Sequence, residues 1–124
     1  MEHAVSTVLI AGLLPIVCAG IAKWGAKTYD NRQPRTWMAS QEGRRARADA
    51  AQKNSFEAFP LFAAGVLVAL HYGVDTHSIA QCGWFFIAMR LAYIYCYVTD
   101  KATWRTAFWL MGLLAVIRLF ALSV

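Results

Sequence analysis

Four apolar runs divide the chain, and three of them have the length of a simple membrane-spanning helix. The first occupies residues 4–22 and contains no charged side chain. At about 1.5 Å per residue, such a run matches a hydrocarbon core about 30 Å thick. Glu2 precedes it rather than Lys or Arg, which disfavours a signal peptide. Residues 79–98 and 102–124 form two further runs, which we expect to be helices.

Residues 40–70 predict a helix of another kind, because their polarity changes along the segment. The first third carries Arg44, Arg45 and Arg47, whereas residues 56–70 are mostly apolar. About 30 helical residues extend roughly 45 Å, which exceeds the hydrocarbon core. We therefore expect the basic end to stand outside the membrane. Pro60 lacks an N–H, so a kink is expected there.

The connectors between these runs carry turn and capping signals. Residues 33–35, Gln-Pro-Arg, are typical of a turn or a helix breaker. Ser40 is a candidate N-cap for the second long helix, and Asp75 or Thr76 for the third. Gly73 is placed to end the second long helix. Together these signals predict four helices separated by three loops.

Composition and charge support a membrane protein over a soluble one. Hydrophobic residues make up 59% of the chain and charged residues only 15%, whereas soluble domains average about 45–50% and about 25%. The fold class is therefore predicted as an all-α, four-transmembrane-helix bundle in one domain, residues 1–124. We expect a bacterial inner membrane, since the chain is small and shows no cleavable targeting segment.

The basic residues are concentrated in one part of the chain. Eight of the twelve Lys and Arg lie between Lys23 and Lys53, while the loop after the second long helix has none. The positive-inside rule then places the first and third loops in the cytoplasm and both termini outside. This charge is explained by membrane topology and anionic lipid, so we expect no nucleic-acid partner.

No metal site is expected. The three cysteines lie in apolar runs without a Cys-x-x-Cys pattern, and the three histidines show no ligand spacing. Buried thiols of this kind behave as small hydrophobic side chains.

Ionisable residues inside the apolar runs are the candidate chemistry, because they are costly in a bilayer and usually face a bundle interior. Glu57, Arg90 and Arg105 are of this kind, whereas Arg118 lies near the chain end and can extend to the interface. Asn54 lies three residues before Glu57 and so shares its helix face.

Arg90, Tyr93 and Tyr97 also share one face of their predicted helix, at spacings of three and seven. Two interpretations follow. The polar groups form a ligand pocket that opens toward the cytoplasm, or Glu57 and Arg90 form a buried ion pair that only fixes helix packing. The spacing alone leaves both open.

Three segments, RADAAQKNSFEAFPLF, RLAYIYCY and WRTAFWL, occur in this order and resemble the MAPEG family, membrane-associated proteins in eicosanoid and glutathione metabolism. The resemblance covers nearly the whole chain. It implies a homotrimer of four-helix subunits, with glutathione as co-substrate bound between neighbouring subunits near the cytoplasmic side.

The resemblance also implies roles for individual residues. Asn54 and Glu57 match residues that hold the glutathione backbone and its amino end, and Arg105 resembles the arginine that faces the sulfur. A nearby guanidinium favours the nucleophilic thiolate over the thiol, so Arg105 is the candidate catalytic residue. The candidate binding residues, Arg90 being added from its spacing, are Gln52, Asn54, Glu57, Arg90, Tyr93 and Tyr97.

Two positions depart from the glutathione-using members. Ala50 stands where an arginine often serves a carboxylate, and Ala58 stands where a tyrosine is common. The family also includes members that bind lipids and catalyse nothing.

Three functions follow from this sequence. The first is a glutathione transferase or peroxidase acting on hydrophobic electrophiles. The alternative is a non-catalytic lipid-binding or scaffold protein of the same fold. A proton-coupled exporter using Glu57 is less favoured, because that residue is expected near the membrane edge rather than at the midplane.

Overall fold

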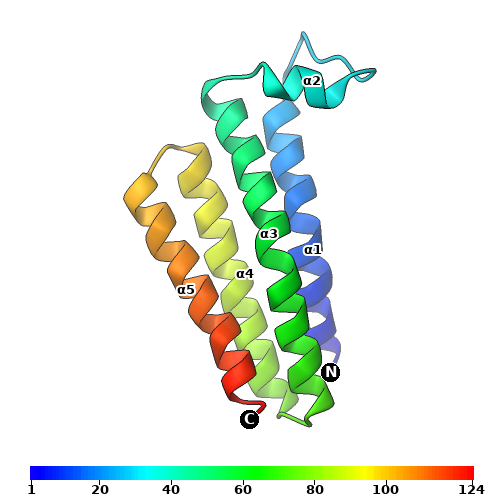
Figure 1. Cartoon of the computed structure of the whole chain (residues 1–124), viewed down its shortest axis with the longest axis vertical. Coiled ribbons are helices and arrows are strands. Elements are labelled where there is room, and N and C mark those ends of the chain that lie inside the picture. The colour runs from blue at the N-terminus through cyan, green and yellow to red at the C-terminus, as the bar shows by residue number, and fades with distance from the viewer.

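The computed structural model describes residues 1–124 and is entirely helical, as the apolar pattern predicted. Four long helices lie side by side, with both termini at one end of the bundle and the short α2 at the other (Figure 1). Each of the four is long and apolar enough to cross a membrane. The helices are α1 (Glu2–Lys23), α2 (Pro34–Ala39), α3 (Gly43–His71), α4 (Thr76–Val98) and α5 (Ala102–Ala121).

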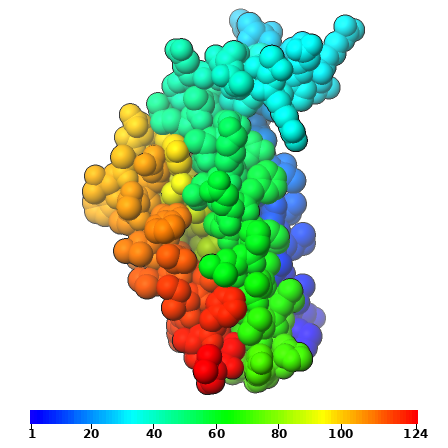
Figure 2. Space-filling view, in the orientation of Figure 1, coloured from blue at the N-terminus to red at the C-terminus, as the bar shows by residue number.

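The expectation of a simple turn or breaker at residues 33–35 was wrong, because Pro34 begins α2. Proline suits the first helical position, where its missing N–H would have had no partner and its φ is already helical. The indole Nε1 of the buried Trp37 donates a hydrogen bond to Thr28 Oγ1 over 3.2 Å. In the space-filling view α2 and the loop before it project past the end of the bundle (Figure 2).

The boundaries of α3 and α4 follow the sequence signals with one exception. Ser40 does not cap α3, which begins at Gly43; its Oγ instead donates to the carbonyl of Trp37 at the end of α2. Gly73 follows the end of α3 with a φ of 72°, a conformation that favours glycine. Asp75 caps α4, since its carboxylate accepts the Ser78 N–H at 3.0 Å. This hydrogen bond holds the pKa of Asp75 below its ordinary value.

Two arginines in the basic half of α3 have structural partners beyond their role in topology. Arg45 Nη1 donates to the carbonyl of Ala22 at 2.8 Å, at the C-terminus of α1. Arg47 donates from Nε and Nη2 to the carbonyl of Val98, at 3.2 and 3.1 Å, at the C-terminus of α4. Cations stabilise helix C-termini, where carbonyls lack partners. The basic end of α3 therefore joins α1 and α4.

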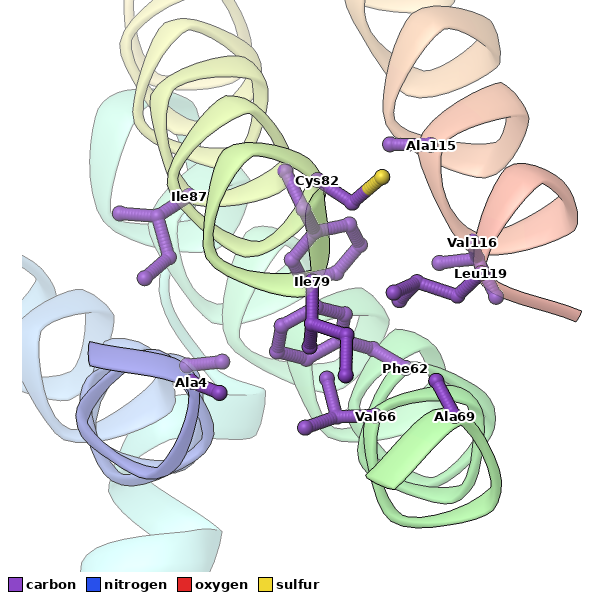
Figure 3. Close-up of a cluster of buried hydrophobic side chains, with 12 residues drawn as sticks. Ala4, Phe62, Val66, Ala69, Ile79, Cys82, Ile87, Ala115, Val116 and Leu119 are labelled. Atoms are coloured by element: carbon purple, nitrogen blue, oxygen red, sulfur yellow. The ribbon is translucent and has the colours of Figure 1, made fainter. Parts of the chain in front are cut away.

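The main core lies toward the end that carries both termini. Side chains from α1, α3, α4 and α5 converge there (Figure 3). Phe62 of α3 stacks on Phe86 of α4, with ring centroids 4.1 Å apart. A second, smaller cluster includes Leu14, Cys18 and Tyr93. In this second cluster Tyr93 of α4 packs with buried side chains of α1.

Close packing of α1 on α4 depends on Gly83. A Cβ built at this position would lie 2.5 Å from Thr7 Oγ1 and under 3 Å from the carbons of the same side chain. Thr7 is fully buried and donates its hydroxyl to the Ala4 carbonyl. Small residues at such crossings let membrane helices approach closely. Gly83 therefore permits the close approach of α1 and α4 at this crossing.

Candidate functional site

A cavity of about 230 Å³ between α3, α4 and α5, here called the polar cavity, collects three of the predicted side chains. Asn54 and Glu57 reach it from α3 and Arg90 from α4, as their spacing indicated. The remaining walls are apolar. They are formed by Ala58, Leu61, Phe86, Trp109, Leu113 and Val116.

Arg90 is a buried cation without a carboxylate partner. Its side chain is 2% exposed, and its Nη2 donates to Ser55 Oγ over 3.0 Å. The buried Glu57–Arg90 ion pair, considered above as a structural alternative, is therefore wrong. Glu57 is exposed at the rim of the cavity, whereas the buried Ser55 hydroxyl faces α4. The one ion pair in the chain joins Lys53 to Asp49.

Arginine and tyrosine side chains form a continuous row from α4 to α5. The Arg90 guanidinium carbon lies 4.2 Å from the Tyr93 ring centroid. Tyr93 meets Tyr97 edge to face, with centroids 5.6 Å apart. The Arg105 guanidinium carbon lies 4.3 Å from the Tyr97 ring centroid. Cation–π contacts of this kind favour a fixed guanidinium, so the row orients both arginines.

Three polar groups at this site have no polar partner within the chain. Asn54 Oδ1 is buried and accepts no hydrogen bond. The Glu57 carboxylate forms no ion pair, and the Arg105 guanidinium is held only against the Tyr97 ring. Buried acceptors in native structures almost always have a partner. The site therefore offers an acceptor, an anion and a cation to a molecule that supplies the complementary groups.

Gln52 lies apart from the other predicted residues. It lines a second cavity of about 550 Å³ between α1, α2 and α3, here called the basic cavity. Two residues of helix correspond to about 200° of rotation, so Gln52 and Asn54 point to different sides of α3. The basic cavity is lined by Ala19, Lys23, Pro34, Arg35, Met38, Ala39, Asp49, Gln52, Lys53 and Phe56.

Sequence reasoning missed two contributors to the polar cavity and its surroundings. Trp109 lies four residues after Arg105 and so shares its face of α5, a signal that could have found it. Ser55, the hydrogen-bond partner of Arg90, lies between Asn54 and Glu57 in sequence. Small hydroxyl residues are common where membrane helices pack, but this alone does not single out Ser55.

The two departures noted in the sequence have visible consequences. Ala58 forms part of the polar cavity wall and supplies no hydroxyl there. Ala50 lies one turn before Asn54 and supplies no cation.

Comparison with known proteins places the chain in a family. The sequence model of the MAPEG family matches residues 3–124, essentially the whole chain. No curated protein matches the sequence. The match agrees with the four long apolar helices, which fit an integral membrane protein. The chain belongs to the MAPEG family.

Proposed function

We propose that this protein is a membrane-embedded, glutathione-dependent transferase or peroxidase that acts on hydrophobic electrophiles. The proposal is supported above all by three polar groups without polar partners, namely Asn54 Oδ1 and Glu57 at the polar cavity and Arg105 at the end of the arginine–tyrosine row. Glutathione carries a matching set of groups, with peptide N–H donors, an ammonium and a thiolate. Membership of the MAPEG family supports a glutathione-related activity in general.

Each group has a definite role in the proposed complex. Glu57 binds the ammonium of glutathione, and Asn54 Oδ1 accepts a peptide N–H. Tyr93 and Tyr97 line the site and keep Arg105 directed at the sulfur. A free thiol has a pKa of about 8.5 and is mostly protonated at neutral pH. The Arg105 guanidinium stabilises the thiolate, and so raises the nucleophilic fraction.

The second substrate enters from the lipid. The apolar cavity walls include Leu61 and Trp109, both exposed on the surface of the subunit. In the transferase reaction the thiolate sulfur forms a bond to an electrophilic carbon, and the bonding electrons of that carbon pass to its leaving group. Arg105 lowers the energy of this step by holding the sulfur oriented and ionised.

The active form is proposed to be a homotrimer with glutathione between neighbouring subunits. Two observations support a shared site. The polar cavity, at about 230 Å³, is smaller than the roughly 300 Å³ at which ligand pockets usually begin. Gln52 and Asn54 lie in different cavities on different sides of α3. One ligand can contact both only if a second copy supplies one of them.

The proposed orientation places the α2 end in the cytoplasm and both termini on the other side of a bacterial inner membrane. Both termini lie at one end of the bundle (Figure 1). Most Lys and Arg lie at the other end, between Lys23 and Lys53, which supports this orientation through the positive-inside rule.

A second candidate is a non-catalytic lipid-binding or scaffold protein of the same fold. Ala50 and Ala58 favour it, because they remove two polar side chains that glutathione-using members often carry. The buried hydrogen bond between Arg90 and Ser55 would then serve only to fix α3 against α4.

Asn54→Ala tests the proposed contact between Asn54 and glutathione. If Asn54 accepts a glutathione N–H, its loss weakens binding about 5- to 10-fold, the effect of one neutral hydrogen bond. Isothermal titration of the detergent-purified protein measures this change. Gln81→Ala is the matched control, since Gln81 is an exposed amide near the start of α4 and does not line the polar cavity. Equal affinity in Asn54→Ala and the wild type would remove Asn54 from the site.

A further inference from the structure

Arg118 is a solitary basic residue at the end of the bundle that carries both termini. It lies in the last turn of α5. Of the twelve Lys and Arg in the chain, Arg118 alone lies near that end. The positive-inside rule accounts for the basic residues at the α2 end of the bundle, but not for a cation at the opposite end. Arg118 therefore has no role in setting the topology.

The Arg118 guanidinium also has no partner within the chain. Its side chain is exposed, and the one ion pair in the protein joins Lys53 to Asp49. The cation–π contacts all involve other cations. Asp75, a carboxylate at the same end of the bundle, is bonded to Ser78 as the cap of α4. Arg118 is therefore free to bind an anion from outside the chain.

Arg118 lines a groove of about 390 Å³ between α4 and α5, here called the α4–α5 groove. Cys82 and Ala115, both buried, turn toward each other from the two helices (Figure 3). Phe85 and Leu114 also line the groove, and they are 42% and 54% exposed. The groove therefore opens onto the surface of the subunit. It shares no residue with the polar cavity.

The polarity of the α4–α5 groove changes with depth. Its two polar side chains are Arg118, three residues before the end of α5, and Gln81, five residues after the start of α4. At 1.5 Å per residue, both lie within about 8 Å of the helix ends. Phe85 and Leu114 lie about one helical turn deeper. The groove is thus polar near the membrane surface and apolar toward the midplane, which is the polarity of a lipid.

We propose that the α4–α5 groove binds an anionic phospholipid, with the phosphate at Arg118 and the upper part of an acyl chain along Phe85 and Leu114. A planar guanidinium can donate two parallel hydrogen bonds to phosphate oxygens. The Gln81 amide already donates to the His77 ring over 3.2 Å, so the phosphate is assigned to Arg118 alone. An anionic headgroup is favoured over a zwitterionic one, because the groove contains a cation and no carboxylate.

The first test locates and ranks the lipid on the full-length protein in detergent. Phosphatidylglycerol with a photoreactive group near the start of one acyl chain is cross-linked to the protein, and mass spectrometry identifies the labelled peptides. In the wild type the label should lie on residues 81–85 and 114–118. Unlabelled phosphatidylglycerol should compete about 5- to 10-fold better than phosphatidylcholine with the same chains, the effect of one basic residue near a membrane surface. Glycerophosphoglycerol, the headgroup alone, should not compete, because it has no acyl chain to bury.

The second test removes the charge. Arg118→Ala should lower labelling of the groove about 5- to 10-fold and abolish the preference for phosphatidylglycerol. Arg118→Lys should keep part of both, since it keeps the charge but loses the planar group. Arg44→Ala, an exposed arginine in the first turn of α3, is the matched control and should leave labelling of the groove unchanged.

Thermal unfolding shows whether Arg118→Ala acts through lipid or through folding. Arg118 has no partner in the chain, so the variant should unfold at the wild-type temperature in lipid-free detergent. Added phosphatidylglycerol should raise the unfolding temperature of the wild type more than that of Arg118→Ala, because a ligand stabilises the state that binds it.

Several results would overturn the proposal. They are label outside the α4–α5 groove, equal competition by the two phospholipids, and unchanged labelling in Arg118→Ala. Competition by glycerophosphoglycerol as strong as by phosphatidylglycerol would overturn it too, since the groove would then be a phosphate site rather than a lipid site. Loss of label and preference in Arg118→Ala, with partial retention by lysine and an unchanged unfolding temperature, would establish it. None of these measurements involves glutathione, so the proposed function is tested separately.

Discussion

Arg105→Ala is expected to lower kcat/KM toward an activated aryl halide by about 100-fold or more, the usual effect of removing a group that stabilises a developing or bound anion. Arg105 is fixed against Tyr97 at the end of the arginine–tyrosine row. The other arginine of the row, Arg90, is buried and donates to Ser55, so it is not free to replace Arg105. The ultraviolet absorption of the bound thiolate should disappear in the same variant. Stopped-flow absorbance measures both quantities on one sample.

The pH dependence of this variant gives an independent check. A positive charge lowers the pKa of a neighbouring thiol, so removing Arg105 returns the pKa of bound glutathione toward about 8.5. The activity of the variant should then rise with pH up to that value, whereas the wild type levels off at lower pH. Arg105→Lys should lie between the two. Arg44→Ala is the control, because Arg44 is exposed in the first turn of α3 and lines neither the polar cavity nor the basic cavity. A wild-type pH profile in Arg105→Ala would exclude thiolate stabilisation by Arg105.

Arg90→Met is expected to stabilise the subunit while weakening glutathione binding. Arg90 is a buried cation whose partners are a hydroxyl and an aromatic ring rather than a carboxylate. Replacing a buried charge with an apolar side chain of similar length is often neutral or stabilising by about 1–4 kcal/mol. Glutathione affinity should fall about 10-fold, because Tyr93 loses the guanidinium that fixes its ring. Thermal unfolding in detergent and isothermal titration measure the two effects.

Arg90→Lys is the matched control for that variant. It keeps the charge and the desolvation cost but loses the planar group over Tyr93, so it should weaken binding without any gain in stability. If Arg90 serves only to join α3 and α4, Arg90→Met should instead lower the unfolding temperature and leave glutathione binding unchanged.

The sequence contained enough information to predict the four long helices and the face that carries the site. Apolar runs of membrane-spanning length are a strong signal, because an unpaired backbone in lipid is so costly that helix is nearly obligatory. Helical spacing likewise placed Asn54 beside Glu57 and Arg90 beside Tyr93. The same three polar side chains, Asn54, Glu57 and Arg90, line the polar cavity in the structure.

Other features depend on tertiary contacts that spacing does not encode. Arg90 donates a hydrogen bond to Ser55 and forms no ion pair with Glu57. The reason is that Ser55 is buried and faces α4, whereas Glu57 is exposed at the rim of the cavity. The short α2 depends on the anchoring of Trp37 by a residue nine positions earlier. Each of these depends on how separate segments dock.

The most direct test of the central claim is an isothermal titration of the wild-type protein, purified in detergent as an intact oligomer, with glutathione. The unpartnered groups of the polar cavity predict a saturable heat at millimolar or lower glutathione, with a thiolate ultraviolet band that grows in parallel. Absence of any binding heat at millimolar glutathione, from protein whose oligomer remains intact, would contradict the proposed glutathione site.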